Sequence, residues 1–415
     1  MPCAASRRRP GASAVAEPAR ALAGLRVLEL GHPAVAYAGK LLADLGADVI
    51  KVEPPGGAPE RRLGPFHGDV PHPERGLVHL FLDTNKRSVT LDLESADGRA
   101  LLRRLVGGAD ALLEGFPPGY LAERGLDYAA LVAEQPRLVM ASVTGFGQDG
   151  PYRDYLAPDF IAFAVGGMMF LSGEPHAPPV TAPCQQAYLI GSVQAALAVL
   201  IALWGRRTSG RGQYLDVSIQ ACLNAQENIF ANYFGPTEFA RRTGSQHRLA
   251  TPGRVFPCAD GFVYMFVSPG TDHWARFLDW IGHPAELDDP VFDHILSRRR
   301  EAERVNAVVR RFTATRTRAE LYAEGQAHRI PIAPVYAPGE AVESEQFQAR
   351  GFVRTIEHPL LGLLRLPGAP YQLGASPWAL RRPPPLLGEH NVAVYGEELG
   401  LAADELGALR EIGAI

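Results

Sequence analysis

The sequence predicts an α/β protein in which a larger domain holds a mostly parallel β-sheet and a smaller domain has α+β character. Three observations predict this class. The chain has 415 residues, enough for two or three domains. Strand-like and helix-like patterns alternate between residues 25 and 147, which is typical of βαβ units. After residue 213 the pattern changes to a hairpin followed by helices.

The first βαβ unit occupies residues 25–55. "LRVLEL" (25–30) is a short β-rich run, and "AGKLLADLG" (38–46) carries its leucines at helical spacing. Gly46 is expected to end the helix, because glycine adopts the left-handed conformation that often follows a helix. "ADVIKVEPP" (47–55) then predicts a second strand that stops at two prolines. The two strands are expected to be parallel, with a right-handed crossover.

The alternation continues to residue 147. "KRSVTLDL" (86–93) predicts a strand, and "ESADGRALLRRLVGGA" (94–109) predicts a helix with Ser95 or Asp97 near its start. "ADALLEGF" (109–116) and "PRLVMASVTGFG" (136–147) predict two further strands.

A Gly/Arg-rich segment, "GRRTSGRGQ" (205–213), separates this region from the next. "GRVFPCADGFVYMFVS" (253–268) predicts a hairpin with Asp260-Gly261 as its turn signal. Helical patterns follow at 272–282 and 300–312, and "IPIAPVYAP" leads out of the smaller domain. The remainder is rich in proline and glycine and ends with a helix near 401–411.

Composition excludes several classes of protein. The net charge of -4 gives no basic face for nucleic acid. The four cysteines form no C-x-x-C pair, so no structural zinc or other metal site is expected, and a reducing, cytoplasmic compartment is favoured. The apolar run 187–204 is interrupted by polar residues and predicts a buried helix rather than a membrane span. Residues 1–21 are interpreted as a disordered arm that is not a signal peptide.

"GFGQDG" (145–150) matches G-x-G-x-x-G but is not a dinucleotide fingerprint. Pro151 follows at once, no helix opens at the third glycine, and no acidic residue ends a later strand at the required spacing. The first βα loop, "GHPAVAYAG", lacks the fingerprint as well. Nicotinamide or flavin chemistry is therefore not expected.

Two sets of polar residues have both a functional and a structural interpretation. Lys86 and Arg87 stand at a strand entrance, where they suit either a phosphate-rich ligand or an ordinary charged strand start. Asp159 heads a strongly apolar segment, where it is either a helix cap or a tuned acid or base beside an apolar surface.

Eight segments in order along the chain resemble the family III CoA-transferases, a group that includes formyl-CoA and carnitine CoA-transferases and the α-methylacyl-CoA racemases. They are "LAGLRVLELG", "LLADLGADVIKVEPPGG", "NKRSVTLDL", "ASVTGFGQDGPYRDY", "GRGQYLDVSI", "PCADGFVYM", "IPIAPV" and "LLGEH". "FPPGYLAERGL" and "QQAYL" are similar to the subgroup of aryl- and alkylsuccinate CoA-transferases.

The resemblance implies a fold and an assembly. A large Rossmann-like, CoA-binding domain is expected from 22–205 with 335–415, a linker at 206–221, and a small α+β domain at 222–334. Two subunits of this family are usually threaded through each other, so an interlocked homodimer, or a heteromer with a paralogue, is expected. No membrane or nucleic-acid partner and no tightly bound cofactor are expected, since CoA and acyl-CoA are substrates.

The resemblance also implies a mechanism in which an aspartate in a G-x-x-D-x-P-P loop receives the acyl group. This chain reads "GEPHAPP" (173–179), with His176 in the aspartate's place. Three alternatives follow: Glu174 substitutes as nucleophile, His176 is acylated or acts as a base, or the chain is a non-catalytic partner of an active paralogue. A two-base racemase is disfavoured, because Pro158 precedes Asp159 and Tyr188 stands near the second aspartate's place.

The resemblance implies coenzyme A contacts at Lys86, at Arg87, and at Phe146 of the "GFGQDG" segment. Transferases often carry a further nucleotide-binding arginine after "PPG"; Glu123 holds that position here, and the adjacent Arg124 is the expected contact. The loop "SPGTD" (268–272), with Gly270 at its centre, is the expected source of backbone N–H groups facing the thioester oxygen. The acyl donor and acceptor are not identified by these residues, although the apolar "AVGGMMFLSG" (164–173) favours an aromatic or branched acid.

Overall fold

A computed structural model of the chain describes residues 19–225, 242–248, 250–268 and 272–415, and it divides into two compact units. Of the described residues, the first unit contains 19–143, 192–217 and 352–415, and the second contains 144–191 and those between 218 and 351. The first unit is thus assembled from distant parts of the chain. The expected large domain ran without a break from 22 to 205, whereas residues 144–191 group with the second unit.

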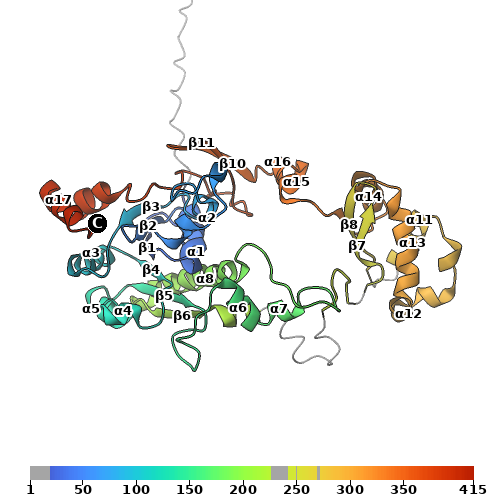
Figure 1. Ribbon diagram of the computed structural model, residues 1–415, viewed down its shortest axis with the longest axis horizontal. Coiled ribbons are helices and arrows are strands. Elements are labelled where there is room, and N and C mark those ends of the chain that lie inside the picture. The colour runs from blue at the N-terminus through green and yellow to red at the C-terminus, as the bar shows by residue number, and fades with distance from the viewer. Residues whose placement is uncertain (1–18, 226–241, 249, 269–271) are drawn as a thin grey trace, which may run out of the picture. The chain divides into compact units, whose positions relative to one another are not determined.

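The first unit is built on a six-stranded sheet with the order β3-β2-β1-β4-β5-β6 (Figure 1). All four pairings among β1 to β5 are parallel. The strand order reverses direction between β1 and β4, which makes that position the topological switch point of a doubly wound sheet. The predicted α/β class is therefore confirmed. The strands are β1 (Arg26–Leu30), β2 (Asp48–Glu53), β3 (Arg87–Thr90), β4 (Ala111–Glu114), β5 (Val139–Thr144) and β6 (Tyr214–Ser218).

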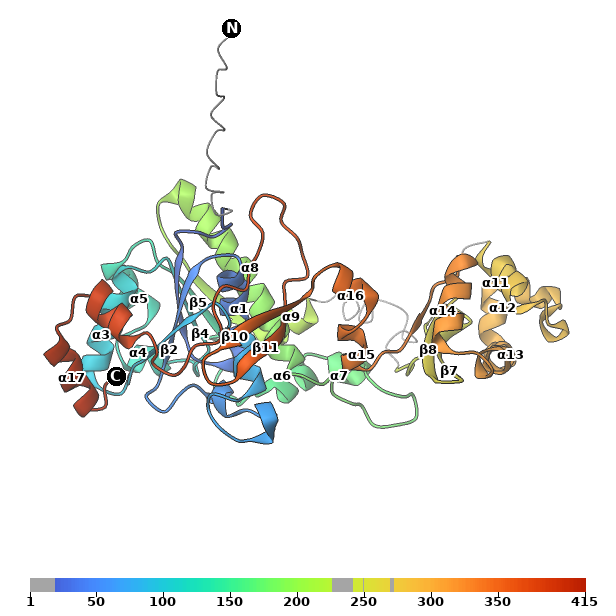
Figure 2. The ribbon, with the colours of Figure 1, turned by 90° about the horizontal axis from the view of Figure 1, so that it is seen from above.

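Helices cover both faces of this sheet, with α3 and α5 on one side and α1 and α8 on the other (Figure 2). Leu28 and Leu30 of β1 point into the core on the α3 side, which also receives Tyr395. On the other side the Ser192 hydroxyl donates to the carbonyl of Ala34 at 2.6 Å, joining α8 to α1. The helices are α1 (Pro33–Asp44), α2 (Leu77–Leu82), α3 (Ala96–Gly107), α4 (Tyr120–Glu123), α5 (Tyr128–Glu134), α8 (Gln186–Ser209), η5 (Val392–Glu398) and α17 (Ala403–Glu411), with short turns η1 (Pro59–Arg62) and η2 (His67–Asp69).

The first βαβ unit forms as predicted from its local signals. Pro33 occupies the first turn of α1, where its missing N–H costs nothing, and His32 accepts a hydrogen bond from the N–H of Ala34 at 3.2 Å. Gly46 follows the helix with a φ of 106°, in the left-handed region that glycine tolerates. In α3, the Ser95 hydroxyl accepts a hydrogen bond from the N–H of Gly98 at 2.9 Å, so Ser95 is the cap.

The C-terminal part of the first unit holds a hairpin that the sequence analysis missed. Strands β10 (Val353–His358) and β11 (Gly362–Pro367) pair in antiparallel register. Their sequence lies in the region treated as irregular because proline and glycine are frequent there. The helix expected near 401–411 is present as α17.

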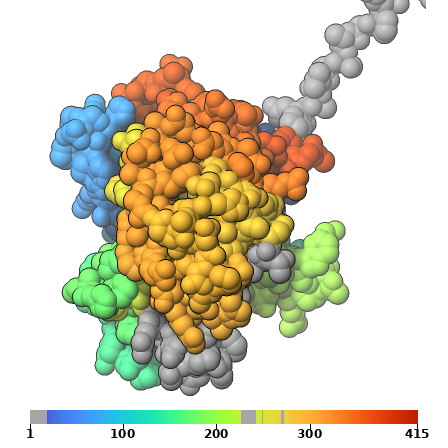
Figure 3. Space-filling view, turned by 90° about the vertical axis from the view of Figure 1, so that its right-hand side faces the viewer, coloured from blue at the N-terminus to red at the C-terminus, as the bar shows by residue number. Residues whose placement is uncertain are grey.

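The second unit contains the predicted hairpin and the helices that pack on it. Strands β7 (Gly253–Cys258) and β8 (Gly261–Phe266) pair antiparallel with Cys258 opposite Gly261, and β9 (Ile332–Pro334) adds to β8. Phe256, Phe277 and Val309 are fully buried between this sheet and its helices. In Figure 3 the yellow and orange segments of this unit form one continuous surface. Its other elements are α6 (Asp159–Val165), α7 (Met168–Leu171), α9 (Ile219–Asn224), α11 (His273–Ile281), η3 (Ala285–Leu287), η4 (Pro290–Asp293), α12 (Ile295–Arg300), α13 (Ala302–Ala314), α14 (Arg318–Ala327), α15 (Pro338–Val342) and α16 (Glu345–Ala349).

Among the described residues, α8 is the one helix whose length and composition would allow it to cross a membrane, and 44% of its most apolar window is buried. Core helices of proteins without a membrane span pass the same test. Ala195 and Val199 are fully buried residues of α8, and Ser192 joins this helix to α1.

Candidate functional site

The switch point of the sheet lies where β1 and β4 end side by side. The chain leaves β1 through Gly31 and His32 into the first turn of α1, and it leaves β4 through Gly115 and Phe116. A Cβ on Gly115 would lie 2.6 Å from Nδ1 of His32, so only glycine lets the two loops approach this closely. In open α/β sheets ligands bind outside the carboxyl ends of the strands at this position.

Two aromatic rings and an arginine form a cluster beside the switch point. The rings of Phe116 and Tyr120 stack with centroids 4.4 Å apart, and the Arg124 guanidinium lies 3.6 Å from the centre of the Tyr120 ring. Both oxygens of Glu94, an exposed residue after β3, accept hydrogen bonds from Nη2 of Arg124, at 2.8 and 2.9 Å. The predicted CoA residue Arg124 therefore lies at the carboxyl edge of the sheet, stacked on an aromatic ring and paired with an acid.

Glu114, the last residue of β4, is a buried acid at the same edge. Its carboxylate accepts a hydrogen bond from the N–H of Phe116 at 2.7 Å. Burial raises the pKa of Glu114 from 4.5 to about 7, more than its hydrogen bonds with Ser142 and Phe116 lower it. Glu114 was not among the residues predicted from the sequence, although its position at the end of a buried strand was an available signal.

Lys86 points into the protein interior instead of toward solvent. Its Nζ contacts Glu29 at 2.7 Å and Asp83 at 2.8 Å, and it donates to the carbonyl of Ala36 at 2.9 Å. A Cβ on Gly39 of α1 would lie 1.7 Å from Glu29 Oε2, so glycine at that position makes room for the Glu29 carboxylate. The predicted CoA contact is thus part of a buried charge network.

The same network holds further charges of β2 and its surroundings. Lys51 pairs with Asp83 at 2.6 Å and with Glu60, while Arg61 binds both oxygens of Glu53 at 2.6 and 2.8 Å. The carboxylates of Glu29, Glu60 and Asp83 lie close enough together to hold a metal ion, but Lys51 and Lys86 already contact them. These ion pairs join β1 and β2 to η1 and to the segment that precedes β3.

All three lysines of the chain lie in this layer. Lys51 and Lys86 have no exposed surface, and Lys40 is 5% exposed, with its Nζ 3.0 Å from Asp44 and 2.6 Å from the Thr84 hydroxyl. Every other cationic side chain of the chain, histidines aside, is an arginine. Every lysine of the chain is thus a buried charge beside carboxylates. The compact ammonium group of lysine suits such a position better than the larger, planar guanidinium of arginine.

Arg87 lies at the opposite edge of the sheet from Arg124. It is the first residue of β3, and it donates to both oxygens of Asp48 at 2.9 and 2.6 Å and also pairs with Glu398. Asp48 is the first residue of β2, so the pair marks the amino edge. The structure does not bring Lys86, Arg87 and Arg124 together.

The loop that carries Glu174 and His176 is an ordered turn in the second unit. The N–H of Ala177 donates to the carbonyl of Glu174 at 3.2 Å, and the N–H of Val180 donates to that of Ser172 at 3.2 Å. These bonds close the loop over residues 172–180. The side chains of Glu174 and His176 are both exposed.

Arg242 fastens this loop through backbone groups. Its guanidinium donates to the carbonyls of Phe170, Glu174 and Ala177 at 3.1, 3.3 and 3.1 Å. The N–H of Gly244 also donates to the carbonyl of Gly173 at 3.1 Å. Arg242 could not be predicted from the sequence, because local patterns do not show the link between positions 242 and 174.

Asp159 is the first residue of α6 and serves a different helix. Its carboxylate accepts a hydrogen bond from the N–H of Tyr188 at 2.9 Å, in the first turn of α8. Burial raises the pKa of Asp159, and the hydrogen bond from Tyr188 acts in the opposite direction. The geometry favours the capping interpretation, although the capped helix is not the one that Asp159 begins.

The remaining predicted contacts lie elsewhere in the second unit or outside the described residues. Phe146 packs edge-to-face against Tyr152 and Tyr155, with ring centroids 5.7 and 6.4 Å away. No helix opens at Gly150, as predicted, and the chain turns there with a φ of 83°. Gly270 lies outside the described residues.

The fold is that of a doubly wound α/β protein, with Gly115 allowing the close approach of two loops at the switch point, and its first βα loop lacks a dinucleotide fingerprint. The model for CoA-transferase family III matches residues 22–391. The chain therefore belongs to CoA-transferase family III, whose members are transferases that use CoA thioesters as substrates.

Known relatives agree with this assignment. The chain is 35% identical over 402 residues to the succinyl-CoA:(R)-benzylsuccinate CoA-transferase subunit BbsE of Thauera aromatica, covering 94% of this chain and 97% of that protein. It is 34% identical over 396 residues to succinyl-CoA--D-citramalate CoA-transferase of Chloroflexus aurantiacus, covering 95% and 98%. The crystal structure of a CAIB/BAIF family protein from Brucella suis is similar with a TM-score of 0.81 and 31% identity, covering 91% and 98%. The resemblance found in the sequence is confirmed.

Proposed function

We propose that this chain is one subunit of a heteromeric CoA-transferase that moves CoA from a succinyl-CoA-type thioester to a carboxylic acid. In this proposal the chain binds CoA, and a paralogous chain supplies the nucleophilic carboxylate. The observation that carries it is the match over nearly the whole length to BbsE, a protein named as a subunit of such an enzyme.

The exposed turn at Glu174 and His176 supports a division of labour between two chains. A mixed anhydride hydrolyses readily, so a nucleophile needs a site from which water is excluded. Glu174 and His176 both face solvent, and Asp159 is engaged with the first turn of α8. Within the described residues of this loop, no acid combines burial with an unused carboxylate.

The exchange then proceeds through the paralogue's carboxylate. That carboxylate attacks the donor thioester carbonyl, the C–S bond breaks, and CoA leaves as a thiolate. The thiolate attacks the enzyme-derived carbonyl of the anhydride, which releases the donor acid and forms an enzyme–CoA thioester. The acceptor carboxylate repeats the two steps in reverse order and leaves as its CoA ester.

The carboxyl edge of the first unit is the proposed place for the CoA nucleotide. The start of α1 lies at this edge, close to the loop that follows β4, but its first N–H groups are held by His32, so the ligand contacts are assigned to side chains. The Phe116–Tyr120 stack offers an aromatic surface, and Arg124 offers a guanidinium. Arg124 is accordingly retained as a CoA contact, whereas Lys86 and Arg87 are assigned to the scaffold.

An apolar stripe on α8 is the proposed contact with the paralogue. Val193, Leu197, Ile201 and Trp204 recur every three to four residues and therefore share one helix face. Their exposed fractions are 43%, 51%, 61% and 70%. A contiguous exposed apolar patch of this kind marks an interaction surface.

The apolar segment beside the loop favours an acceptor acid with an aryl or branched substituent. Phe160 of α6 and Phe170 of α7 are more than half exposed, and Val165 is 43% exposed. All three belong to the unit that carries the loop around His176. Such side chains suit a hydrophobic substituent better than they suit formate or oxalate.

The test is to purify the chain alone and after co-expression with a paralogue from the same source, then incubate each with succinyl-CoA and an arylsuccinate. Alone, the chain is expected to bind CoA, to form no covalent adduct by intact mass, and to show no exchange. The co-purified pair is expected to exchange CoA, with the adduct mapping to the paralogue. An adduct on Glu174 or His176 of the isolated chain contradicts the proposal.

A second candidate is a self-sufficient homodimer that uses Glu174 or His176. It is favoured by the equally complete match to the citramalate CoA-transferase, whose name designates no subunit. The same experiment separates the two, because exchange by the chain alone supports the homodimer.

A further inference from the structure

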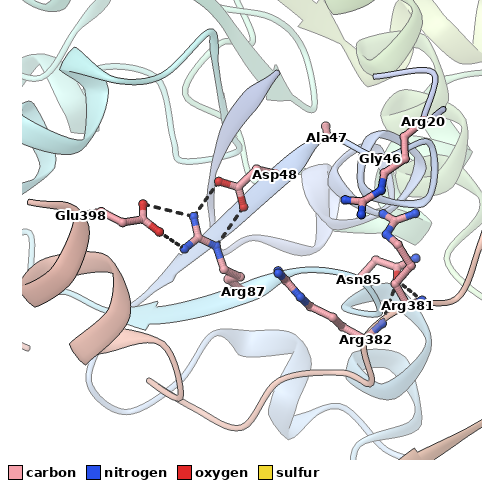
Figure 4. A pocket seen from close by; sticks show the side chains of 9 residues that line it. All are labelled: Arg20, Gly46, Ala47, Asp48, Asn85, Arg87, Arg381, Arg382 and Glu398. Atoms are coloured by element: carbon pink, nitrogen blue, oxygen red, sulfur yellow. Dashed lines mark hydrogen bonds and ion pairs between the residues drawn. The ribbon is translucent and has the colours of Figure 1, made fainter. Parts of the chain in front are cut away.

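A charged pocket lies at the amino edge of the sheet in the first unit, away from the switch point. Its volume is about 590 Å³, which is within the range of small-molecule sites. Figure 4 shows the pocket between the starts of β2 and β3 and the segment 381–382. It is lined by Arg20, Gly46, Ala47, Asp48, Asn85, Arg87, Arg381, Arg382 and Glu398.

The two acids of this pocket are already paired. Asp48 and Glu398 both contact Arg87, and both also contact Arg26, at 3.1 and 2.9 Å. The pocket lining contains four arginines and two acids, so its side chains carry an excess of two positive charges. Within the part of the chain that the structure describes, Arg381 and Arg382 form no salt bridge with a carboxylate.

A buried amide holds Arg381 and Arg382 at the rim. Asn85, which is 4% exposed and has a φ of 65°, accepts hydrogen bonds from the N–H groups of both residues at 2.6 and 3.1 Å. The Asn85 side-chain amide donates to Asp44 at 2.6 Å, which fixes its orientation. The site is therefore built on a buried polar anchor, and the arginines do not merely extend from a loose surface loop.

Arg20 approaches from the other side. A Cβ on Gly46 would lie 2.5 Å from Cβ of Arg20, so glycine allows the Arg20 backbone to pack there. Burial and the nearby charges of Arg20 and Arg382 lower the pKa of Arg381, whereas the charge of Asp44 acts in the opposite direction. Arg20, Arg381 and Arg382 all line the pocket, with Nη2 of Arg381 donating to the carbonyl of Ala43, and an anion among these guanidinium groups would be stabilised.

We propose that this pocket is a second ligand site, separate from the CoA site, that binds the phosphate group of a small polar phosphate ester. The excess of two charges matches a phosphate dianion, and guanidinium groups bind phosphate oxygens in pairs. The described lining includes no aromatic side chain, so a base-stacked nucleotide is not the expected ligand. The opposite position of Arg124, at the carboxyl edge, keeps the two sites apart.

The test is calorimetric titration of the full chain with pyrophosphate at low ionic strength, in the presence of saturating CoA. Saturation prevents pyrophosphate from occupying the CoA site. Succinate, a dicarboxylate dianion, is titrated in a parallel arm. The variant Arg382→Gln removes one positive charge at the pocket rim and breaks no side-chain hydrogen bond that the structure describes. The control is Arg410→Gln, which removes one positive charge from an exposed position of α17.

Wild type is expected to bind pyrophosphate, and Arg382→Gln is expected to bind it at least about 10-fold more weakly, the scale of one charge-assisted hydrogen bond. Arg410→Gln should match wild type, and all three proteins should bind CoA alike. No pyrophosphate heat with wild type, equal affinity in Arg382→Gln, or tighter binding of succinate overturns the proposal. If the chain does not bind CoA, the proposed function is refuted but the phosphate site is not. Pyrophosphate is then titrated without CoA, and the same outcomes test the site.

Discussion

The carboxylate of Asp159 and the backbone N–H of Tyr188 are joined by a hydrogen bond of 2.9 Å. Asp159 lies at the start of α6, and Tyr188 lies in the first turn of α8, 29 residues later. The bond satisfies one of the N–H groups that a helix N-terminus leaves unpaired. Asp159, which the sequence suggested either as a helix cap or as an acid or base, therefore caps α8 from the start of α6.

Replacing Asp159 with alanine is expected to destabilise the second unit by about 1 kcal/mol, the usual cost of losing a cap. Asp159→Asn keeps an acceptor oxygen and should retain most of the stability. Urea denaturation of both variants measures the difference. If Asp159→Asn folds with wild-type stability but abolishes exchange in the co-purified pair, the acid has a chemical role and the capping assignment is insufficient.

The lysine network predicts an unusual pattern of chemical labelling. Lys40, Lys51 and Lys86 are buried and paired with carboxylates, and they are the three lysines of the chain. An amine-reactive reagent at pH 8 should leave all three unmodified in the folded protein, since the reagent attacks only an accessible, deprotonated amine. Peptide mapping after brief exposure gives the answer, with urea-unfolded protein as the control in which all three react. Rapid labelling of Lys86 in the folded chain, with protection by CoA, would restore it as a CoA contact.

Glu114 makes stability depend on pH near neutrality. Its pKa is about 7 in the folded chain against 4.5 for an exposed glutamate, because burial disfavours the charged form. The folded state therefore binds the proton more tightly, and the free energy of unfolding falls as pH rises from about 4.5 through 7. Over that interval the loss amounts to about 3 kcal/mol.

Glu114→Gln mimics the protonated side chain and should remove this contribution. Urea midpoints at pH 5.5 and pH 8 are expected to differ less in the variant than in wild type, with the variant the more stable at pH 8. An unchanged difference between the two pH values would mean that another group is responsible.

The elements that the sequence predicted correctly depend on signals that lie within a few residues. Gly46 after α1, Ser95 before α3 and the Asp260-Gly261 turn each act on neighbouring backbone, so their effect is visible in the local pattern. The hairpin of β10 and β11 was missed because its strands lie among prolines and glycines. The pairing itself is local, from His358 opposite Gly362 to Val353 opposite Pro367, and forms a separate two-stranded sheet, so the composition of the region hid a signal that was present.

The site was harder to predict for a physical reason. A Lys-Arg pair at a strand entrance looks the same in sequence whether it faces a ligand or the interior. The inward orientation of Lys86 depends on its contact with Glu29, which is 57 residues away in the sequence. Arg87 and Arg124 both looked like phosphate ligands, yet they lie at opposite edges of one sheet. Which edge a residue occupies depends on whether it precedes or follows its strand, and strand boundaries are the least certain part of a sequence-based prediction.

Arg124 is expected to bind CoA in competition with Glu94. Arg124→Ala should weaken CoA binding about 10-fold, since it removes a charge-assisted contact to phosphate. Glu94→Gln should strengthen binding slightly, because an exposed pair worth about 0–1 kcal/mol no longer holds the guanidinium. Calorimetry at two salt concentrations measures both, with Arg311→Ala, an exposed arginine that pairs with Glu286 in the second unit, as the matched control. Equal CoA affinity in wild type and Arg124→Ala would remove Arg124 from the site.

The stripe on α8 is expected to hold the paralogue, so polar substitutions there should separate the two chains. Leu197→Ser and Trp204→Ser change side chains that are 51% and 70% exposed, so each should leave the fold of the single chain intact. In the co-purified pair, light scattering coupled to gel filtration should show a shift from the heteromer to free chains, and exchange should fall in proportion.

Leu363→Ser, at a 73% exposed leucine of β11, is the control that should leave assembly unchanged. If the α8 variants assemble normally, the stripe serves another purpose, and partitioning of wild type into lipid vesicles, lost in Trp204→Ser, would identify that purpose as membrane contact. Because the side chains of Leu197 and Trp204 are more than half exposed, a change in assembly without a change in the urea midpoint assigns the effect to the interface itself.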